Sequence, residues 1–185
     1  MALKIVLYGD PILRQKALAI AEVTEEVKQL AGEMIETMIR ADSGVGLAAP
    51  QVGRSIRLFV LRDEKFSSSD EMEFHPPEVV INPVFSNPSK ETEEADEGCL
   101  SLPKIQVKVE RPLEIDVRYT NLQGEEIQER LKGFRARIFM HENDHLNGTL
   151  IIDRTSDKER RQVEPMLRKI KASIKLPSDR CKVAR

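Results

Sequence analysis

Residues 134–148 read FRARIFMHENDHLNG and carry two of the three histidines of the chain. The sequence predicts a helix from about Phe134 to Leu146. We expect this helix to stop at Asn147–Gly148, because glycine just past the last turn is a favoured C-terminal cap. A residue type that is scarce in this chain is thus concentrated on one short helix, which is the expected place of the chemistry.

The two histidines, His141 and His145, are four residues apart. Four residues turn an α-helix through about 400°, so both imidazoles project from one face, roughly 6 Å apart. This arrangement suits two ligands of one tetrahedral cation. Glu142 sits about 100° around the helix, near enough to reach a water on that cation. The alternative is two surface histidines on an ordinary helix.

A hydrolytic metal site needs a third protein ligand and an open position. Metzincin proteases would place a third histidine where this chain has Ile151. Thermolysin-like proteases use a glutamate further downstream, and Glu159 and Glu164 are available, but both lie in a polar, basic stretch. The better candidate is Cys99, between an acidic run and a predicted strand, although a free cysteine is more often a small buried hydrophobe.

The rest of the chain predicts helices near both ends and strands between them. Thr24 is the expected N-cap of a helix that reaches about Arg40. A third helix is expected from Ser156 to Ile174, in which Pro165 either causes a kink or marks a new first turn. Short separators between the strands favour antiparallel pairing, and this order of elements predicts an α+β domain. The predicted strands cover Ile56–Leu61, Val79–Phe85, Ile105–Val109 and Ile115–Tyr119.

The chain has 185 residues, a net charge of −2, two cysteines and no apolar run that suits a signal peptide or a membrane span. We expect one unexported domain over residues 1–185 in a reducing compartment, because two cysteines form no disulfide framework. The balanced charge does not favour non-specific binding to nucleic acid. Residues 154–185 differ, since eleven Lys or Arg stand against four Asp or Glu, which gives this expected basic helical tail a net charge of +7.

The segment GVGLAAPQ, residues 44–51, is also unusual. Two glycines around Val45 let the backbone come close to a ligand, and Gln51 offers a neutral amide donor. The segment is not a phosphate loop, because the Lys-Ser/Thr ending is missing. Taken alone, it could equally be a glycine-containing turn.

Three segments together resemble the signature motifs of peptide deformylases, in the family's order and at its typical separations. They are Gly44–Gln51, Glu97–Ser101 and His141–His145. The likeness covers about residues 5–155 and leaves the tail outside it. It implies mostly antiparallel β-sheets packed around a central metal-binding helix, with an N-terminal and a C-terminal helix. It also implies a metal-dependent hydrolase that removes the N-formyl group from the N-terminal formyl-methionine of nascent polypeptides and releases formate.

The resemblance also implies roles for individual residues. Cys99, His141 and His145 would be the metal ligands, and Glu142 the general acid and base. The residue before the first histidine is often Gln in this family, whereas this chain has Met140, which is not a ligand.

The oxyanion of the reaction would be stabilised by the Gln51 amide and the backbone N–H of Leu100. Backbone groups of the glycine motifs would bind the extended substrate like an added strand. These substrate-binding residues are Val45, Gly46 and Gly98. Candidates for an apolar pocket around the methionine side chain are Phe134, Ile138 and Phe139.

The ligand set alone does not identify the cation, because zinc, Fe(II), Co(II) and Ni(II) all accept one thiolate and two imidazoles. The resemblance implies Fe(II) in the cell, with Zn(II), Ni(II) or Co(II) in purified protein. It implies formyl-methionyl peptides and nascent chains as partners, no membrane, no specific DNA, and the bacterial cytoplasm rather than an organelle.

The basic tail suits an RNA surface, and a cotranslational enzyme gains from docking beside the ribosomal exit tunnel. The alternative is a charged surface helix packed through Val163, Leu167 and Ile170. Cys181 in this tail is expected to be an inert thiol.

Three smaller features complete the expectations. Asp144 either orients groups around the metal helix or is a solvated acid. The acidic run Glu91–Glu97 is typical of a solvated loop whose last residue holds the cysteine turn in place. His75, followed by two prolines, is expected at the surface.

Two other functions would keep part of the pattern. A metallopeptidase built on the same His-Glu-x-x-His helix would not need Cys99. A non-catalytic module that holds structural zinc would not need Glu142 as a base.

Overall fold

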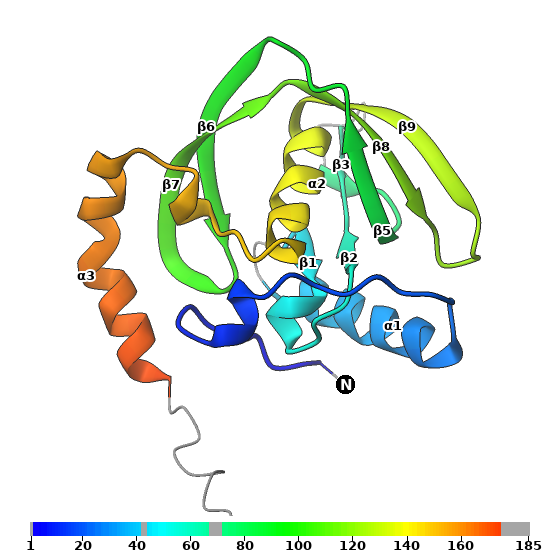
Figure 1. Ribbon diagram of the computed structural model, residues 1–185, viewed down its shortest axis with the longest axis horizontal. Helices are drawn as coiled ribbons and strands as arrows, with labels where there is room; N and C mark the ends of the chain where they lie inside the picture. The colour runs from blue at the N-terminus through cyan, green and yellow to red at the C-terminus, as the bar shows by residue number, and fades with distance from the viewer. Residues whose placement is uncertain (1, 42–43, 67–71, 175–185) are drawn as a thin grey trace, which may run out of the picture.

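The computed structural model describes residues 2–41, 44–66 and 72–174 of the chain (Figure 1). Its helices are α1 (Glu25–Arg40), α2 (Gly133–Leu146) and α3 (Asp157–Ser173), with short 3-10 helices η1 (Pro11–Arg14), η2 (Ala49–Val52) and η3 (Ile151–Asp153). The strands are β1 (Gly46–Ala48), β2 (Leu58–Leu61), β3 (Glu64–Phe66), β4 (Met72–Phe74), β5 (Glu78–Ser86), β6 (Thr92–Cys99), β7 (Leu102–Pro112), β8 (Glu114–Thr120) and β9 (Glu126–Lys132).

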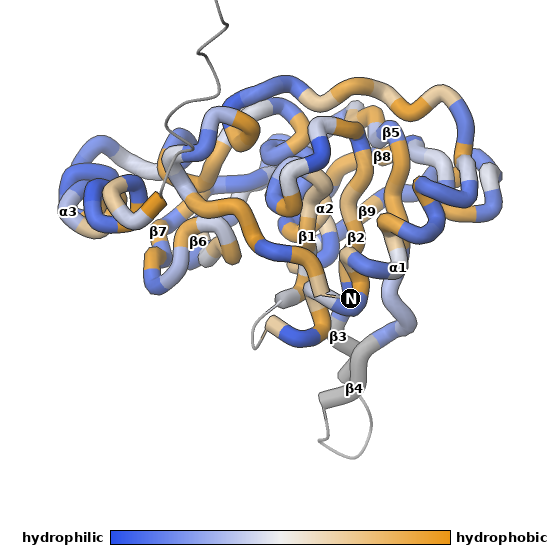
Figure 2. Tube along the Cα trace, turned by 90° about the horizontal axis from the view of Figure 1, so that it is seen from below, coloured by the Kyte–Doolittle hydropathy of each residue, from blue (hydrophilic) through white to orange (hydrophobic). Residues whose placement is uncertain are grey.

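The largest sheet has the order β1-β2-β5-β8-β9, and all its neighbours are antiparallel. Successive side chains of a strand point to opposite faces, and β2 shows the consequence. Phe59 packs in one cluster with Phe139 of α2, whereas Leu58 packs in another with Met34 of α1. The two helices therefore cover opposite faces, and the hydrophobic strands lie between them (Figure 2).

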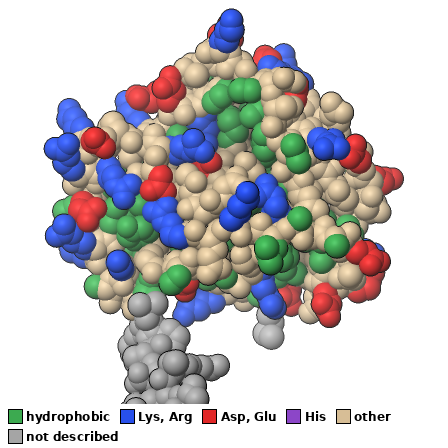
Figure 3. Space-filling model, viewed as in Figure 1, with side chains coloured by type: hydrophobic (Ala, Val, Ile, Leu, Met, Phe, Trp, Pro, Cys, Tyr) green, Lys and Arg blue, Asp and Glu red, His purple; other side chains and the backbone are tan. Residues whose placement is uncertain are grey.

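A separate two-stranded sheet is formed by β6 and β7, which pair from Thr92↔Pro112 to Cys99↔Leu102 with a bulge at Gly98/Cys99. Alternate residues of β7, such as Ile105 and Val107, are buried against Val163 and other apolar residues of α3. The curved hairpin thus stands between α2 and α3 (Figure 1). Charged side chains, many of them Lys or Arg, cover the α3 side of the molecule (Figure 3).

Most predicted elements are present. The N-cap of α1 is Thr24, whose side chain accepts a hydrogen bond from Val27 N. Gly148 follows the C-cap of α2 with a φ of +71°, as a left-handed glycine cap requires. The α+β class is confirmed, and so is packing of α3 through its apolar stripe. Because α3 continues through Pro165, a new helix start at that proline is wrong.

The interpretation of Glu91–Glu97 as a solvated loop is wrong, because all but the first of these residues belong to β6. Strand pairing with β7 compensates for the poor β-propensity of these acidic residues. Glu94 lies opposite another acid, Glu110, but its carboxylate forms an ion pair with Lys108. The expectations for the tail beyond Ile174, including Cys181, lie outside the described residues. Within the described ranges, no helix is long and apolar enough to cross a membrane.

Candidate active site

Helix α2 is buried on most of its surface, because it lies between the main sheet and the β6–β7 hairpin. Its apolar side is fixed in the core by Phe139, which meets Phe59 edge to face with ring centroids 5.4 Å apart. His141 and His145 project from the other side of the helix, and Glu142 lies between them and Phe139. The main sheet thus fixes the rotation of the helix and points the two histidines away from the core.

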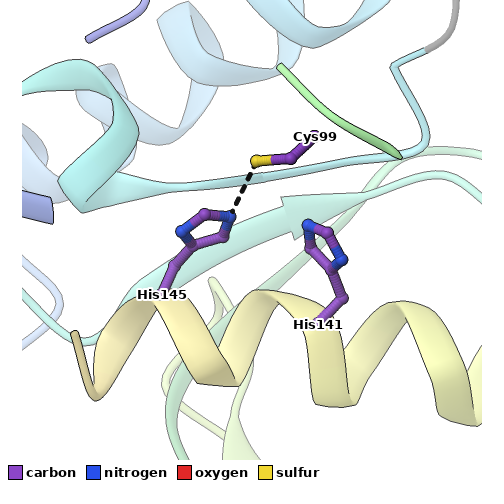
Figure 4. A group of neighbouring side chains, drawn as sticks. All are labelled: Cys99, His141 and His145. Atoms are coloured by element: carbon purple, nitrogen blue, oxygen red, sulfur yellow. Dashed lines mark hydrogen bonds between the residues drawn. The ribbon is translucent and has the colours of Figure 1, made fainter. Parts of the chain in front are cut away.

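Cys99 meets the two histidines from the end of β6 (Figure 4). Its Sγ atom lies 3.3 Å from Nε2 of His145. The ring centroids of His141 and His145 are 5.2 Å apart. One ligand atom from each of the three residues falls within 4.8 Å of the other two. One sulfur and two imidazole nitrogens at this separation suit a four-coordinate cation with one open position.

Glu97 fixes the orientation of His141. Its Oε2 atom lies 2.9 Å from Nδ1 of His141, and the same carboxylate accepts hydrogen bonds from Arg111 at 2.6 and 2.8 Å and from Arg137 at 2.9 Å. Burial alone would raise the pKa of Glu97, but the hydrogen bonds to Arg111 and His141 outweigh it and lower the pKa far below its usual value. An ionised Glu97 accepts a hydrogen bond from Nδ1–H of His141, which leaves the unprotonated Nε2 of His141 free to bind a cation.

Asp144 completes this buried network. It is 6% exposed and accepts hydrogen bonds from Arg111 Nη1 at 3.0 Å and from Arg154 Nη2 at 2.5 Å. The alternative of a solvated acid is therefore wrong. Since Arg111 bridges Asp144 and Glu97, a second residue of α2 is connected to the carboxylate that orients His141.

Glu142 is 4% exposed, and its Oε2 atom has no hydrogen-bond partner among the described residues. Burial raises the pKa of Glu142 to about 7. Gly46 makes room for it, because a Cβ atom at position 46 would lie 2.3 Å from Oε1 of Glu142. A carboxyl group with a pKa near neutrality can both take and give a proton at physiological pH.

His145 has the environment of a neutral imidazole. Burial lowers its pKa well below the usual value, and the nearby positive charge of Arg111 acts in the same direction. Its Nδ1 atom has no partner in the part of the chain that the structure describes. Metal ligation requires an unprotonated ring nitrogen, so these surroundings fit a ligand.

Gln51 is buried beside the cysteine. Its Oε1 atom accepts a hydrogen bond from Ala48 N at 2.8 Å, which fixes which end of the amide faces the site. The Nε2 group then points to Ser101 Oγ at 3.2 Å and to Cys99 Sγ at 3.5 Å. The amide donor therefore lies next to the three candidate ligands.

These groups open into a cavity of about 920 Å³. The cavity wall includes the three expected substrate-binding residues, Val45, Gly46 and Gly98. Leu100 also belongs to it. Of the three candidates for a methionine pocket, Phe134 and Ile138 line the cavity. Phe139 was a wrong candidate, because it lies fully buried against the main sheet.

Other residues considered from the sequence lie elsewhere. His75 is exposed, as expected. Ile151 is buried with the apolar residues under α3. Glu159 accepts hydrogen bonds from Lys108 N and Thr155 Oγ1 instead of approaching the histidines. Glu164 accepts a hydrogen bond from Arg168 Nε, so neither a metzincin-type nor a thermolysin-type third ligand is present at these positions.

Three residues that support the site were not identified from the sequence, namely Ser101, Arg111 and Arg137. Arg111 and Arg137 are 4% and 6% exposed. One signal was available: an acid that enters the cysteine motif needs cations if it is buried. The sequence could not say which of its 29 Lys and Arg would supply them.

The chain is similar to known proteins over most of its length. The family model for polypeptide deformylases matches residues 2–161. A peptide deformylase of Thermotoga maritima is 45% identical over 172 residues, which is 93% of this chain and 98% of that protein.

Solved structures agree with this likeness. The crystal structure of the Thermotoga maritima peptide deformylase has a TM-score of 0.75 at 47% identity and covers 84% of this chain and 99% of its own. A Plasmodium falciparum peptide deformylase has a TM-score of 0.81 at 36% identity, with 90% and 94% covered. The chain belongs to the peptide deformylase family, the metal-dependent hydrolases that remove the N-formyl group from nascent peptides.

Proposed function

We propose that Cys99, His141 and His145 hold the single divalent cation of this deformylase and that Glu142 moves the protons of the reaction. The observation that carries the proposal is the convergence of the three ligand atoms within 4.8 Å beside a buried Glu142 whose Oε2 is unpartnered among the described residues. A structural zinc site would close the fourth position with another protein ligand, whereas this group faces a cavity.

A cation on these ligands would supply a water that is acidic enough to become a nucleophile near neutral pH. Glu142 would accept the proton of the attacking water and later donate one to the departing amine. Its pKa of about 7 suits both directions of transfer. Gly46 keeps the Glu142 carboxylate close to the substrate backbone, because no side chain intervenes.

The oxyanion that forms at the formyl carbon is stabilised by two donors of the chain. One is Nε2 of Gln51, which is held in place by the bond between its Oε1 atom and Ala48 N. The other is the backbone N–H of Leu100, in the turn that follows Cys99. Donors fixed before the reaction stabilise developing charge without having to reorganise.

The formyl peptide binds in extended form between two strand edges. In the described sheets, β1 pairs only with β2, and β6 pairs only with β7. Residues of both strands, Gly46 and Gly98, line the same cavity. An added strand could therefore hydrogen-bond to both edges, with Val45 extending the β1 side. Phe134 and Ile138 provide apolar surface for the methionine side chain.

The decisive experiment measures formate release from formyl-Met-Ala by protein purified without oxygen, beside Glu142→Gln and Cys99→Ser. Glu142→Gln keeps the shape of the side chain but cannot accept a proton, so formate release should fall by at least 100-fold with the metal content unchanged. Cys99→Ser should lose metal and activity together. A Cys99→Ser protein with full metal content and activity would overturn the ligand assignment and favour the metallopeptidase alternative.

We further propose Fe(II) as the cation in the cell, with Zn(II), Ni(II) or Co(II) able to replace it in purified protein. The mixed sulfur and nitrogen ligands support this range, because all four ions accept them. Metal analysis of protein prepared anaerobically should find iron. Protein that retains zinc and no iron under those conditions would contradict the assignment.

The cellular setting is also a proposal. The bacterial relatives support a bacterial cytoplasm, where nascent chains are the substrates. Exposed Lys158, Arg161, Arg168 and Lys169 support contact of α3 with ribosomal RNA. Replacing these four by Gln should weaken cosedimentation with ribosomes and reduce its salt dependence, while formate release from a dipeptide stays the same.

A single domain over residues 1–185 stays a prediction.

A further inference from the structure

The N-terminal segment, residues 3–9, belongs to none of the strands of the described chain, yet it is anchored at both ends. Leu3 N donates a hydrogen bond to Oγ1 of Thr37 on α1 at 2.7 Å. At the other end, Gly9 has a φ of +112° and lies against α3, where a Cβ atom would be 2.9 Å from Cγ of Lys171. We call residues 3–9 the N-terminal strap. In Figure 1 it runs in dark blue from the side of α1 toward the turn that joins β6 and β7.

Two N–H groups of the strap bind the two parts of the chain that carry the oxyanion donors. Val6 N donates to the backbone carbonyl of Gln51 at 2.7 Å. Tyr8 N donates to the backbone carbonyl of Ser101 at 2.9 Å, and Ser101 directly follows Leu100. In an extended chain, alternate N–H groups point to the same side and lie about 7 Å apart. The strap thus sets the spacing between Gln51 and the turn that contains Leu100.

This spacing needs support, because the two donors belong to separate parts of the fold. Gln51 lies in η2, which follows the main sheet, whereas Leu100 lies in the turn of the β6–β7 hairpin. The side-chain contacts between these parts run through Nε2 of Gln51, which lies 3.2 Å from Ser101 Oγ and 3.5 Å from Cys99 Sγ. An amide NH₂ group has two protons, so its donation to an oxyanion gives up one of these contacts. The contacts of the strap use backbone carbonyls instead and persist during the reaction.

We propose that the strap is a positioning element of the deformylation reaction, in which the N–H groups of Val6 and Tyr8 fix the separation of the two oxyanion donors. The proposal rests on the proposed function. Neither residue is part of the cavity wall, so each acts through the donor that it holds. Val6 acts through the Gln51 amide, and Tyr8 acts through the N–H of Leu100. Both donors can then reach the same oxygen without reorganising.

The test replaces single amide bonds of the strap by esters, which removes one N–H group and keeps every side chain. Cell-free translation places the α-hydroxy acid counterpart of Val6 or Tyr8 in the full-length chain, and formate release from formyl-Met-Ala is measured after metal loading. A displacement of about 1 Å can cost about 100-fold in rate, and loss of one contact permits a smaller one, so each ester should lower kcat about tenfold. KM and metal content should stay the same. A role limited to stability would lower the melting temperature and leave kcat unchanged.

Leu7 provides the matched control, because its N–H group has no hydrogen-bond partner among the described residues. An ester at this position makes the same chemical change between the two tested positions, and kcat should match that of the wild type. An ester at Leu7 that lowers kcat as much as those at Val6 and Tyr8 would overturn the proposal. Wild-type kcat in all three ester variants would overturn it too, while leaving deformylation intact.

Combination with Gln51→Ala shows which donor each contact supports. The ester at Val6 should lower kcat no further in this background, because the amide that it positions is already absent. The ester at Tyr8 should still lower kcat about tenfold, because Leu100 remains. A further loss from the Val6 ester would overturn its assignment to Gln51. Full activity of Gln51→Ala by itself, or no formate from the wild-type protein, would instead contradict the proposed function.

Discussion

Oε2 of Glu97 lies 2.9 Å from Nδ1 of His141, although the two residues are 44 positions apart in the chain. The contact joins the only acidic residue of β6 that is buried to the first histidine of α2. Because Glu97 is also bound by Arg111 and Arg137, its carboxylate cannot turn away from the imidazole without breaking ion pairs. The orientation of a candidate metal ligand thus depends on a buried ionic network.

Glu97→Gln tests this dependence. The amide keeps the shape of the side chain but removes the buried negative charge that Arg111 and Arg137 share. We expect metal affinity to fall by about 10- to 100-fold and the protein to lose about 3 kcal/mol of unfolding free energy. Metal titration with a competing chelator and urea denaturation measure the two effects. Glu94→Gln is the control, because its ion pair with Lys108 is long and exposed. Equal metal affinity in both variants would contradict the positioning role.

Gly46→Ala tests the close approach of β1 to Glu142. The new Cβ atom would lie 2.3 Å from Oε1 of Glu142, so the carboxylate must move. We expect kcat for formate release to fall by about 10- to 100-fold, since a shift of about 1 Å near the reacting atoms can cost 100-fold.

Gly32→Ala is its matched control. Gly32 lies within α1, and a Cβ atom there would meet nothing within 4 Å. This change should raise the unfolding free energy by about 0.5–1 kcal/mol, because alanine is the better helix former, with no effect on kcat. A Gly46→Ala enzyme of full activity would show that the Glu142 carboxylate is not confined.

Gln51→Ala removes the amide donor beside Cys99. The expected loss is about 100- to 1,000-fold in kcat, which corresponds to about 2.7–4 kcal/mol of barrier, as for other oxyanion donors. KM for formyl-Met-Ala should change little, because the donor acts on charge that develops in the transition state. Metal content is measured in parallel. A loss of activity explained by metal loss alone would assign Gln51 to ligand support and not to the oxyanion.

Asp153 predicts a pH dependence of stability. Burial alone would raise its pKa, but hydrogen bonds from Arg14 and the Leu150 backbone outweigh it and lower the pKa below the usual value of 3.8. A lowered folded-state pKa means that the unfolded chain binds the proton more tightly, so the stabilisation is complete above about pH 4 and is lost at lower pH.

The corresponding variant is Asp153→Asn. We expect it to be about 1 kcal/mol less stable than the wild type at pH 7, a small value because Asp153 is partly exposed and screened by solvent. The difference should shrink as the pH falls below about 4. Urea denaturation at pH 7 and at pH 3 measures it. A difference that is constant with pH would show that the charge of Asp153 is not responsible.

Several local features were determined by the sequence alone. The spacing of His141 and His145 places both imidazoles on one face of any α-helix, whatever surrounds it. Thr24 and Gly148 mark helix ends through hydrogen bonds and backbone angles that involve only near neighbours in the chain. The order of helices and strands was enough for the α+β class. The three sequence motifs indicated the peptide deformylase family, and the comparisons with known proteins then showed it.

Strands were harder to predict where their stabilisation is not local. In β6, acidic residues mask the strand pattern, and only pairing with β7 and the cations of Arg111 and Arg137 allow Glu97 to be buried as a charge. β9 was missed for a related reason, since its charged residues alternate with few apolar ones. β-Propensity depends on neighbouring strands, which a single segment does not contain.

The placement of Cys99 against the histidines, and of Met166 in the same cavity, was decided only by the tertiary structure. Both contacts join segments that are distant in sequence, and they form because α2 is held between the main sheet and the hairpin while α3 packs on the outer side of β7. A local pattern fixes where a side chain points on its own helix or strand. Which other side chain it meets depends on how the buried faces of the separate elements pack together.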